Sequence, residues 1–177
     1  MQQGLIHIYT GAGKGKTTAA IGLGIRAYGQ GLKVLMVQFL KGWTTGEMKV
    51  IESLGPRFQL FQYNKENDKF TWGMTDDEMK GIKGEMRIGL NYTIEAVMSG
   101  EWDLIIMDEV MVTVNCGFLT LEEVVEIVEN KPLKLELVLT GRDAPLKLIE
   151  LADYVSEITP RKHPMEKGIM AREGIEY

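Results

Sequence analysis

Thr10-Gly11-Ala12-Gly13-Lys14-Gly15-Lys16-Thr17-Thr18 is the stretch that decides the fold of this 177-residue chain. It follows an apolar segment, residues 5–9, that is typical of a strand, and it precedes a helix-like segment, residues 19–28. Glycines allow backbone N–H groups to turn toward one point, where the N-terminus of the following helix adds partial positive charge. A glycine-rich loop ending in Gly-Lys-Thr in this context predicts a nucleoside triphosphate site.

Two side chains of this loop suit that role, although the spacing departs from the usual pattern. Lys16 supplies a full positive charge, and the Thr17 hydroxyl can reach a phosphate-bound Mg²⁺. The pattern G-x-x-x-x-G-K-[ST] would place its first glycine at Thr10, whereas this chain has Gly11 one place later. The alternative interpretation, a flexible surface turn, does not explain two lysines among the glycines.

The composition is that of an ordinary globular chain, which limits the possible functions. A length of 177 residues with 45% hydrophobic and 25% charged residues suits one domain with a substantial core. The net charge of -5 argues against broad nucleic-acid binding, which usually needs a basic face. Cys116 is the only cysteine, so no intrachain disulfide or thiolate metal cluster is expected.

The distribution of apolar residues also bears on location. No basic region precedes an apolar stretch at the N-terminus, which argues against a signal peptide. No apolar run approaches the roughly 18 residues that a membrane span requires. We therefore expect a cytoplasmic protein with neither a membrane segment nor a nucleic-acid partner.

Apolar runs alternate with segments of helical periodicity, which is typical of βαβ units. The nearly continuous apolar character of the runs predicts a sheet covered on both faces. The expected class is therefore α/β, a P-loop NTPase-like three-layer sandwich with a mostly parallel central sheet, in a single domain of residues 1–177. The expected strands are residues 5–9, 32–39, 57–63, 104–107, 135–139 and, at an edge, 154–158.

Two expected helices begin with capping boxes, at residues 75–78 and 120–123, where Thr can cap and Glu can reach back. Behind the first, apolar residues recur at helical spacing over residues 79–97 and form one face. Three glycines interrupt this helix, and each is expected to weaken it by about 1 kcal/mol relative to alanine. They are Gly81, Gly84 and Gly89.

Charged residues follow several strand ends. Asp108 and Glu109 come after the apolar run 104–107, in a segment that looks like a Walker B motif, while Lys41 and Arg142 follow two other strands. Because ligands of parallel sheets bind beyond the carboxyl ends of the strands, we expect these residues to converge on the phosphate loop.

These charged residues have alternative roles. A carboxylate at a strand end can hold Mg²⁺ directly or through water, and Glu109 could instead polarise water as a base. Capping of the next segment is the alternative for both Asp108 and Glu109. Arg142 could pair with phosphate or with a carboxylate such as Asp143.

Two aromatic residues, Phe70 and Trp72, lie in a polar stretch before the first capping box. Propensity alone favours loop residues that tuck into the core. The alternative is a flat apolar surface for a planar ligand. The segment 41–47, which mixes glycine, tryptophan and charge, is expected to be either a lid or a surface crossing.

Taken together, these residues resemble the ATP:corrinoid adenosyltransferases of the CobA/BtuR type. The order and spacing of the motifs match essentially from end to end, and a loop with its glycine one place late is normal for that family. Phe-x-Trp is the most specific element. The matching segments are residues 10–20, 37–42, 46–47, 70–72, 103–109, 140–142, 148–153, 162–163, 168 and 171–177.

The resemblance implies a transferase that moves the 5′-deoxyadenosyl group of ATP to the cobalt of a corrinoid, cobalamin or a precursor, and releases triphosphate. The cobalt must first be reduced to Co(I), by a reductase or a flavin electron donor, and then attacks C5′ directly. Co(I) is already a strong nucleophile, so the lack of a recognisable Ser-His or Cys-His pair is consistent with this chemistry. Members are usually homodimers.

The resemblance also implies roles for individual residues. Phe70 and Trp72 would pack against the lower corrin face and exclude an axial ligand, and Thr17 with Asp108 or Glu109 would handle Mg²⁺. Lys16, Thr17, Phe70 and Trp72 are thus the expected catalytic set. The expected ATP-binding residues are Gly11, Ala12, Gly13, Lys14, Gly15, Lys16, Thr17, Thr18, Lys41 and Arg142.

One departure from the family concerns how the site is covered. Some members carry an N-terminal extension before the first strand, whereas here that strand begins by about Leu5. We therefore expect either a more exposed Co(I) state or another loop in the place of the extension.

Two other functions remain open at this stage. One is a P-loop switch that hydrolyses ATP or GTP, with Glu109 activating water. The other is a nucleotide-dependent corrinoid carrier that forms no cobalt–carbon bond.

Overall fold

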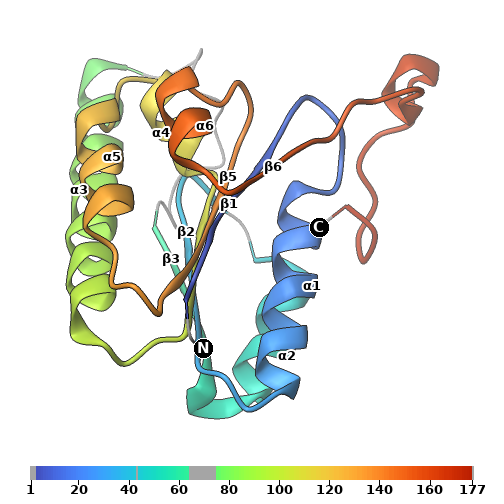
Figure 1. The fold of residues 1–177 in the computed structure, drawn as a ribbon. Helices are drawn as coiled ribbons and strands as arrows, with labels where there is room; N and C mark the ends of the chain where they lie inside the picture. The colour runs from blue at the N-terminus through green and yellow to red at the C-terminus, as the bar shows by residue number, and fades with distance from the viewer. Residues whose placement is uncertain (1–2, 43, 64–74, 177) are drawn as a thin grey trace.

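The computed structural model describes residues 3–42, 44–63 and 75–176. In this part of the chain, six strands form one sheet in the order β3-β2-β4-β5-β1-β6, and every strand pairing is parallel (Figure 1). The predicted α/β class is confirmed, and the sheet is wholly rather than mostly parallel among these residues. The strands are Ile6–Thr10 (β1), Val34–Gln38 (β2), Phe58–Gln62 (β3), Leu104–Asp108 (β4), Glu136–Thr140 (β5) and Tyr154–Glu157 (β6).

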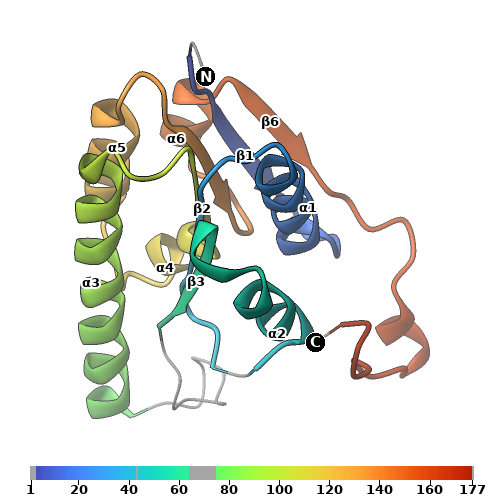
Figure 2. The same ribbon diagram turned by 90° about the horizontal axis from the view of Figure 1, so that it is seen from below.

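Helices cover both faces of the sheet, as Figures 1 and 2 show from two directions. The helices α1 (Lys16–Gly29) and α2 (Gly46–Ser53) lie on one face. The other face carries α3 (Asp76–Ser99), α4 (Val110–Asn115), α5 (Leu121–Asn130) and α6 (Leu146–Leu151). The chain moves from β1 to β3 over the first face and returns over the second, as right-handed crossovers require. Two 3₁₀ turns complete the described elements, Gly55–Arg57 (η1) and Pro164–Lys167 (η3).

The core consists of two apolar clusters separated by the sheet. Along β2, Leu35 and Val37 pack toward the cluster under α3 and α5, whereas Val34 and Met36 pack toward the cluster under α1. Successive side chains of a strand point to opposite faces, so an unbroken apolar run serves both clusters. All five residues of β2 and of β4 are buried, which confirms the expectation of a sheet covered on both sides.

Both predicted capping boxes are present. The Thr75 backbone N–H donates to Glu78 Oε2 at 2.8 Å, and the Glu78 N–H donates to Thr75 Oγ1 at 3.3 Å. The same reciprocal pair joins Thr120 and Glu123 at 2.9 and 3.3 Å. These bonds satisfy N–H groups that a helix start leaves without partners, so α3 and α5 begin at the residue that the sequence indicates.

The sequence did not predict the three shortest helices. Helix α2 occupies part of the segment that was expected to be a lid or a surface crossing, and α4 and α6 have six residues each. Six residues give fewer than two helical turns, and the eight of α2 give only slightly more, which is too few for apolar periodicity to stand out. Among the described residues, no helix has the length and apolar character needed to cross a membrane.

The three glycines of α3 are not equivalent. A Cβ added at Gly81 or Gly84 would meet open space, whereas at Gly89 it would lie 2.8 Å from Tyr63 Cδ2 and 3.2 Å from Phe39 Cε1. The expectation that each glycine only weakens the helix is therefore wrong for Gly89, because its missing side chain allows aromatic rings to pack against the helix.

We predict opposite effects on stability for two substitutions in α3. Gly84→Ala should raise the free energy of unfolding by about 0.5–1 kcal/mol, because it removes backbone freedom without a clash. Gly89→Ala should lower it by about 1–3 kcal/mol, the usual cost of overpacking. Chemical denaturation of both variants checks this, and equal stabilisation by both would contradict the close packing at Gly89.

Candidate active site

The loop between β1 and α1 is braced by the chain that follows β6. Gly11 and Gly15 adopt positive φ angles of 98° and 121°. A Cβ on Gly11 or Gly13 would lie 2.5 or 2.7 Å from the Ile158 carbonyl oxygen, and the Gly13 N–H donates to that oxygen at 2.7 Å. Glycine is therefore required by conformation at Gly11 and by close backbone approach at both Gly11 and Gly13.

Thr10 explains why the first glycine stands one place late. It is the last residue of β1 and is 8% exposed, and its Oγ1 accepts a hydrogen bond from the Ala144 N–H at 3.2 Å. The chain first needs a positive φ at Gly11, so position 10 is available for a side chain that ties the loop to the segment after β5.

Lys16, the first residue of α1, joins two carbonyl groups of the loop through hydrogen bonds. Its Nζ donates to the carbonyl oxygens of Gly11 at 2.7 Å and Gly13 at 2.9 Å, and the residue is only 7% exposed. Burial lowers the pKa of the Lys16 amine, an effect that the charge of Glu109 opposes. The amine thus lies against the backbone of the loop, and it adds positive charge to the pocket that the loop lines.

Asp108, at the end of β4, is fully buried and is held by donors from several elements. Its Oδ1 accepts hydrogen bonds from the hydroxyls of Thr17 at 2.9 Å and Thr140 at 2.7 Å. Its Oδ2 accepts from Gln38 Nε2 at 3.1 Å and lies 3.5 Å from Lys41 Nζ. A carboxylate removed from water needs such partners, so its orientation is fixed by α1, β2 and β5 together.

Glu109 follows directly and has a different environment. Its φ of 62° is left-handed, and its N–H donates to Thr140 Oγ1 at 2.9 Å. This turn directs the side chain into a pocket instead of the core. Burial, with the neighbouring charge of Asp108, raises the pKa of the Glu109 carboxyl, while the charge of Lys16 opposes the shift.

A pocket of about 600 Å³ lies over the loop. Four cations line it: Lys14 and Lys16 from the loop or its helix, Lys41 after β2, and Arg142 after β5. The predicted convergence of strand-end residues is therefore present. The full lining comprises Ala12, Gly13, Lys14, Gly15, Lys16, Thr17, Thr18, Ile21, Lys41, Gly46, Glu47, Glu109, Arg142, His163, Gly174, Ile175 and Glu176.

The remaining predicted residues lie elsewhere. Gly11 packs against Ile158 below the pocket, and Asp108 lies in the core, where it contacts Thr17 rather than the pocket itself. Phe70 and Trp72 fall outside the described residues.

Sequence reasoning missed part of this site. Gln38 is fully buried and links Asp108 to Gln62, whose Nε2 donates to Gln38 Oε1 at 3.2 Å. A glutamine at the end of an otherwise apolar run was the available signal. The pocket-lining residues 174–176 belong to a segment that resembles the family, but nothing in the sequence placed them at the pocket, because only folding brings the C-terminal segment back to the loop.

The oxygen atoms near the loop suit a hard divalent cation. Among the described residues, no group of three or more His, Cys, Asp or Glu side chains could hold a metal by itself. A cation here would therefore share its ligands with a phosphate chain, as Mg²⁺ commonly does.

Comparison with known proteins adds a family and a fold. A family model described as ATP:corrinoid adenosyltransferase BtuR/CobO/CobP matches residues 2–177. A corrinoid adenosyltransferase of Escherichia coli K12 is 37% identical over 177 residues, covering 99% of this chain and 87% of that protein. The corrinoid adenosyltransferase CobA of Salmonella typhimurium is 35% identical over 179 residues, with the same two coverages.

A solved structure supports the P-loop NTPase-like fold. A KaiC-like protein of Pyrococcus horikoshii superposes with a TM-score of 0.53 at 15% identity, covering 91% of this chain and 75% of that one. At such low identity the likeness concerns the arrangement of the chain alone.

The raised pKa of Glu109 predicts a pH-dependent stability. A carboxyl whose pKa is higher in the folded than in the unfolded state stabilises the fold at low pH, and this contribution is lost as pH rises from about the ordinary value of 4.5 through the raised one. Glu109→Gln, which cannot ionise, should therefore gain stability relative to the unaltered protein as pH rises above the ordinary value of 4.5. Urea denaturation of the nucleotide-free protein measures this difference.

The exposed Glu129 provides the control, because Glu129→Gln removes the same charge far from the pocket. If the free energies of unfolding of both variants change in parallel with pH, the burial of Glu109 is not the cause of the pH dependence.

Proposed function

Because this chain belongs to the ATP:corrinoid adenosyltransferase family BtuR/CobO/CobP, we propose that it transfers the 5′-deoxyadenosyl group of ATP to the Co(I) of a corrinoid, cobalamin or a precursor. The observation that carries this proposal is the cationic pocket over the phosphate loop in a chain that the family model matches over residues 2–177. Residues 1–177 would act as one P-loop adenosyltransferase domain.

The reaction places modest demands on acid–base chemistry. Co(I) supplies both electrons of the new cobalt–carbon bond, and the C5′–O bond breaks so that inorganic triphosphate leaves with its bonding pair. A nucleophile this strong needs no general base. The protein must instead align cobalt with C5′ and stabilise the charge that develops on the leaving group.

The pocket offers the groups for the second task. Lys14, Lys41 and Arg142 line it from three different segments, so their positive charges can stabilise the negative charge on the triphosphate as it leaves. The first residues of α1 also line the pocket, so the backbone N–H groups at this helix start add hydrogen-bond donors for phosphate. Lys16 holds the loop in shape through its two carbonyl contacts and contributes charge from below.

Thr17, Asp108 and Glu109 fit a magnesium ion that arrives with ATP. Asp108 already accepts hydrogen bonds from Thr17, Thr140 and Gln38, so we assign it to orienting the Thr17 hydroxyl. Glu109 reaches the pocket and is the better candidate for direct or water-mediated contact. The ion would supply charge neutralisation on the triphosphate.

The corrinoid side of the proposal rests on the family. We assign Phe70 and Trp72 to the lower corrin face, where apolar rings would exclude an axial ligand and make Co(II) easier to reduce. The family likeness also supports a homodimer, and a reductase or flavin as the source of the electron.

The test is an anaerobic reaction with Mg-ATP and chemically reduced cob(I)alamin. We expect the Co(I) spectrum to disappear, a light-sensitive adenosyl product to form, and triphosphate to appear in equal amount. Orthophosphate with unchanged Co(I) would indicate an NTPase instead. Saturable corrinoid binding with neither product would indicate a carrier.

Replacing both aromatic residues separates corrinoid chemistry from nucleotide binding. Phe70→Ala combined with Trp72→Ala should reduce adenosylation by about 10²-fold or more, because misplacement of the reacting atoms alone can have that effect. Calorimetric titration should show unchanged ATP affinity. Normal turnover in the double variant would contradict the assigned role.

A further inference from the structure

The C-terminal segment returns to the phosphate loop. After β6 the chain extends beyond α1 and comes back toward the start of that helix (Figures 1 and 2). Gly174, Ile175 and Glu176 consequently line the same pocket as the loop. The proposed activity does not account for this arrangement.

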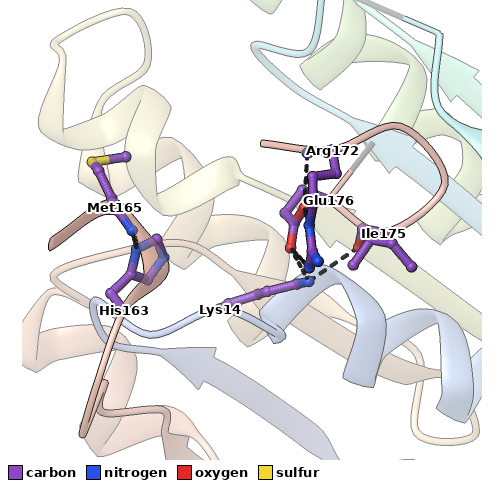
Figure 3. Close-up of polar contacts among 6 residues, drawn as sticks. All are labelled: Lys14, His163, Met165, Arg172, Ile175 and Glu176. Carbon is purple, nitrogen blue, oxygen red and sulfur yellow. Dashed lines mark hydrogen bonds and ion pairs between the residues drawn. The ribbon is translucent and has the colours of Figure 1, made fainter. Parts of the chain in front are cut away.

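The contact between the two segments is polar and specific. Lys14 Nζ donates to Glu176 Oε1 at 2.9 Å and to the Ile175 carbonyl oxygen at 3.1 Å (Figure 3). On its other side, the Glu176 carboxylate accepts from the backbone N–H of Arg172 at 2.8 Å, from its Nε at 3.2 Å and from its Nη2 at 3.1 Å. A single carboxylate thus lies between a guanidinium and the ammonium group of the phosphate loop.

These partners are those that a phosphate group would take. Guanidinium and ammonium groups bind carboxylate and phosphate oxygens with similar geometry. Arg172 and then Lys14 lower the pKa of Glu176 to about 2, so the carboxylate is an anion at any physiological pH. It therefore presents Lys14 with the same kind of ligand as ATP does.

The other lysines of the pocket also have internal oxygen partners. Lys16 contacts two loop carbonyls, and Lys41 lies 3.5 Å from Asp108 and 3.7 Å from Glu47. Lys14 differs because its partner comes from a segment 162 residues away in sequence that also lines the pocket. Apart from Lys14, the hydrogen-bond partners of the Glu176 carboxylate in the described part of the chain are all in Arg172, within its own segment.

We propose that the Glu176 carboxylate competes with triphosphate for Lys14. It positions Lys14 before nucleotide binds, and it pairs with Lys14 again as triphosphate leaves. This inference rests on the proposed function, since it concerns the same phosphate pocket. Glu176 is a positioning residue in this account, because it acts through Lys14.

The contact is weak enough to exchange. The Lys14 and Glu176 side chains are 51% and 23% exposed, so water screens their attraction. ATP and triphosphate carry several negative charges and meet additional cations in the pocket. Either ligand can therefore displace a single carboxylate, at a modest loss of affinity.

Glu176→Gln tests this directly, because it removes the charge and keeps the size of the side chain. Calorimetric titration with Mg-ATP, and separately with inorganic triphosphate, should show about two- to fivefold tighter binding, the range expected for one exposed ion pair. Triphosphate should also inhibit adenosylation at correspondingly lower concentrations, while the KM for the corrinoid stays unchanged.

Glu173→Gln is the matched control. It removes the same charge from the same segment, and Glu173 makes no ion pair with Lys14 in the described part of the chain. Its affinity for triphosphate should equal that of the unaltered protein. Thermal unfolding of both variants checks that each remains folded.

Two results would overturn the proposal. Equal affinities in the two variants would show that the contact does not compete with phosphate, and weaker binding by Glu176→Gln would show that Glu176 supports the bound nucleotide. Failure of adenosyl transfer is a separate outcome, because triphosphate binding is measured without a corrinoid. If the unaltered protein bound neither ATP nor triphosphate, both proposals would fall.

Discussion

The buried carboxylate of Asp108 constrains the whole site. A charge without access to water has to be compensated by hydrogen bonds, and its donors come from α1, β2 and β5. Gln38 can donate only because the register of β2 against β4 places it beside Asp108. Strand register, the start of α1 and the orientation of the buried Asp108 carboxylate are thus parts of one arrangement.

A second constraint acts on the phosphate loop through the chain after β6. The Ile158 carbonyl lies so close to Gly11 and Gly13 that no side chain fits at either position. The same backbone then leads into the segment that carries Glu176. The loop is therefore held against the chain after β6 by a backbone hydrogen bond at Gly13, while its Lys14 contacts an exchangeable anion.

Much of the fold could be predicted from the sequence because its signals are local. Most of the strands appear as largely apolar runs, and the two longest helices on the second face begin with capping boxes that need only four adjacent residues. The strand-end positions of Asp108 and Arg142 followed from the same reasoning, because parallel strands end at one edge. The short helices α4 and α6 were missed because their lengths hold too few turns for a pattern.

What the sequence by itself determined is the α/β class, the phosphate loop and, through its motifs, the family. Each of these depends on the order of residues along a short stretch or on their spacing. Tertiary structure alone decided that Gly89 allows aromatic rings to pack, that Gln38 orients Asp108, and that Glu176 lies against Lys14. The physical reason is that these are contacts between segments distant in sequence, whose energies depend on distances that exist only once the sheet and its helices have formed.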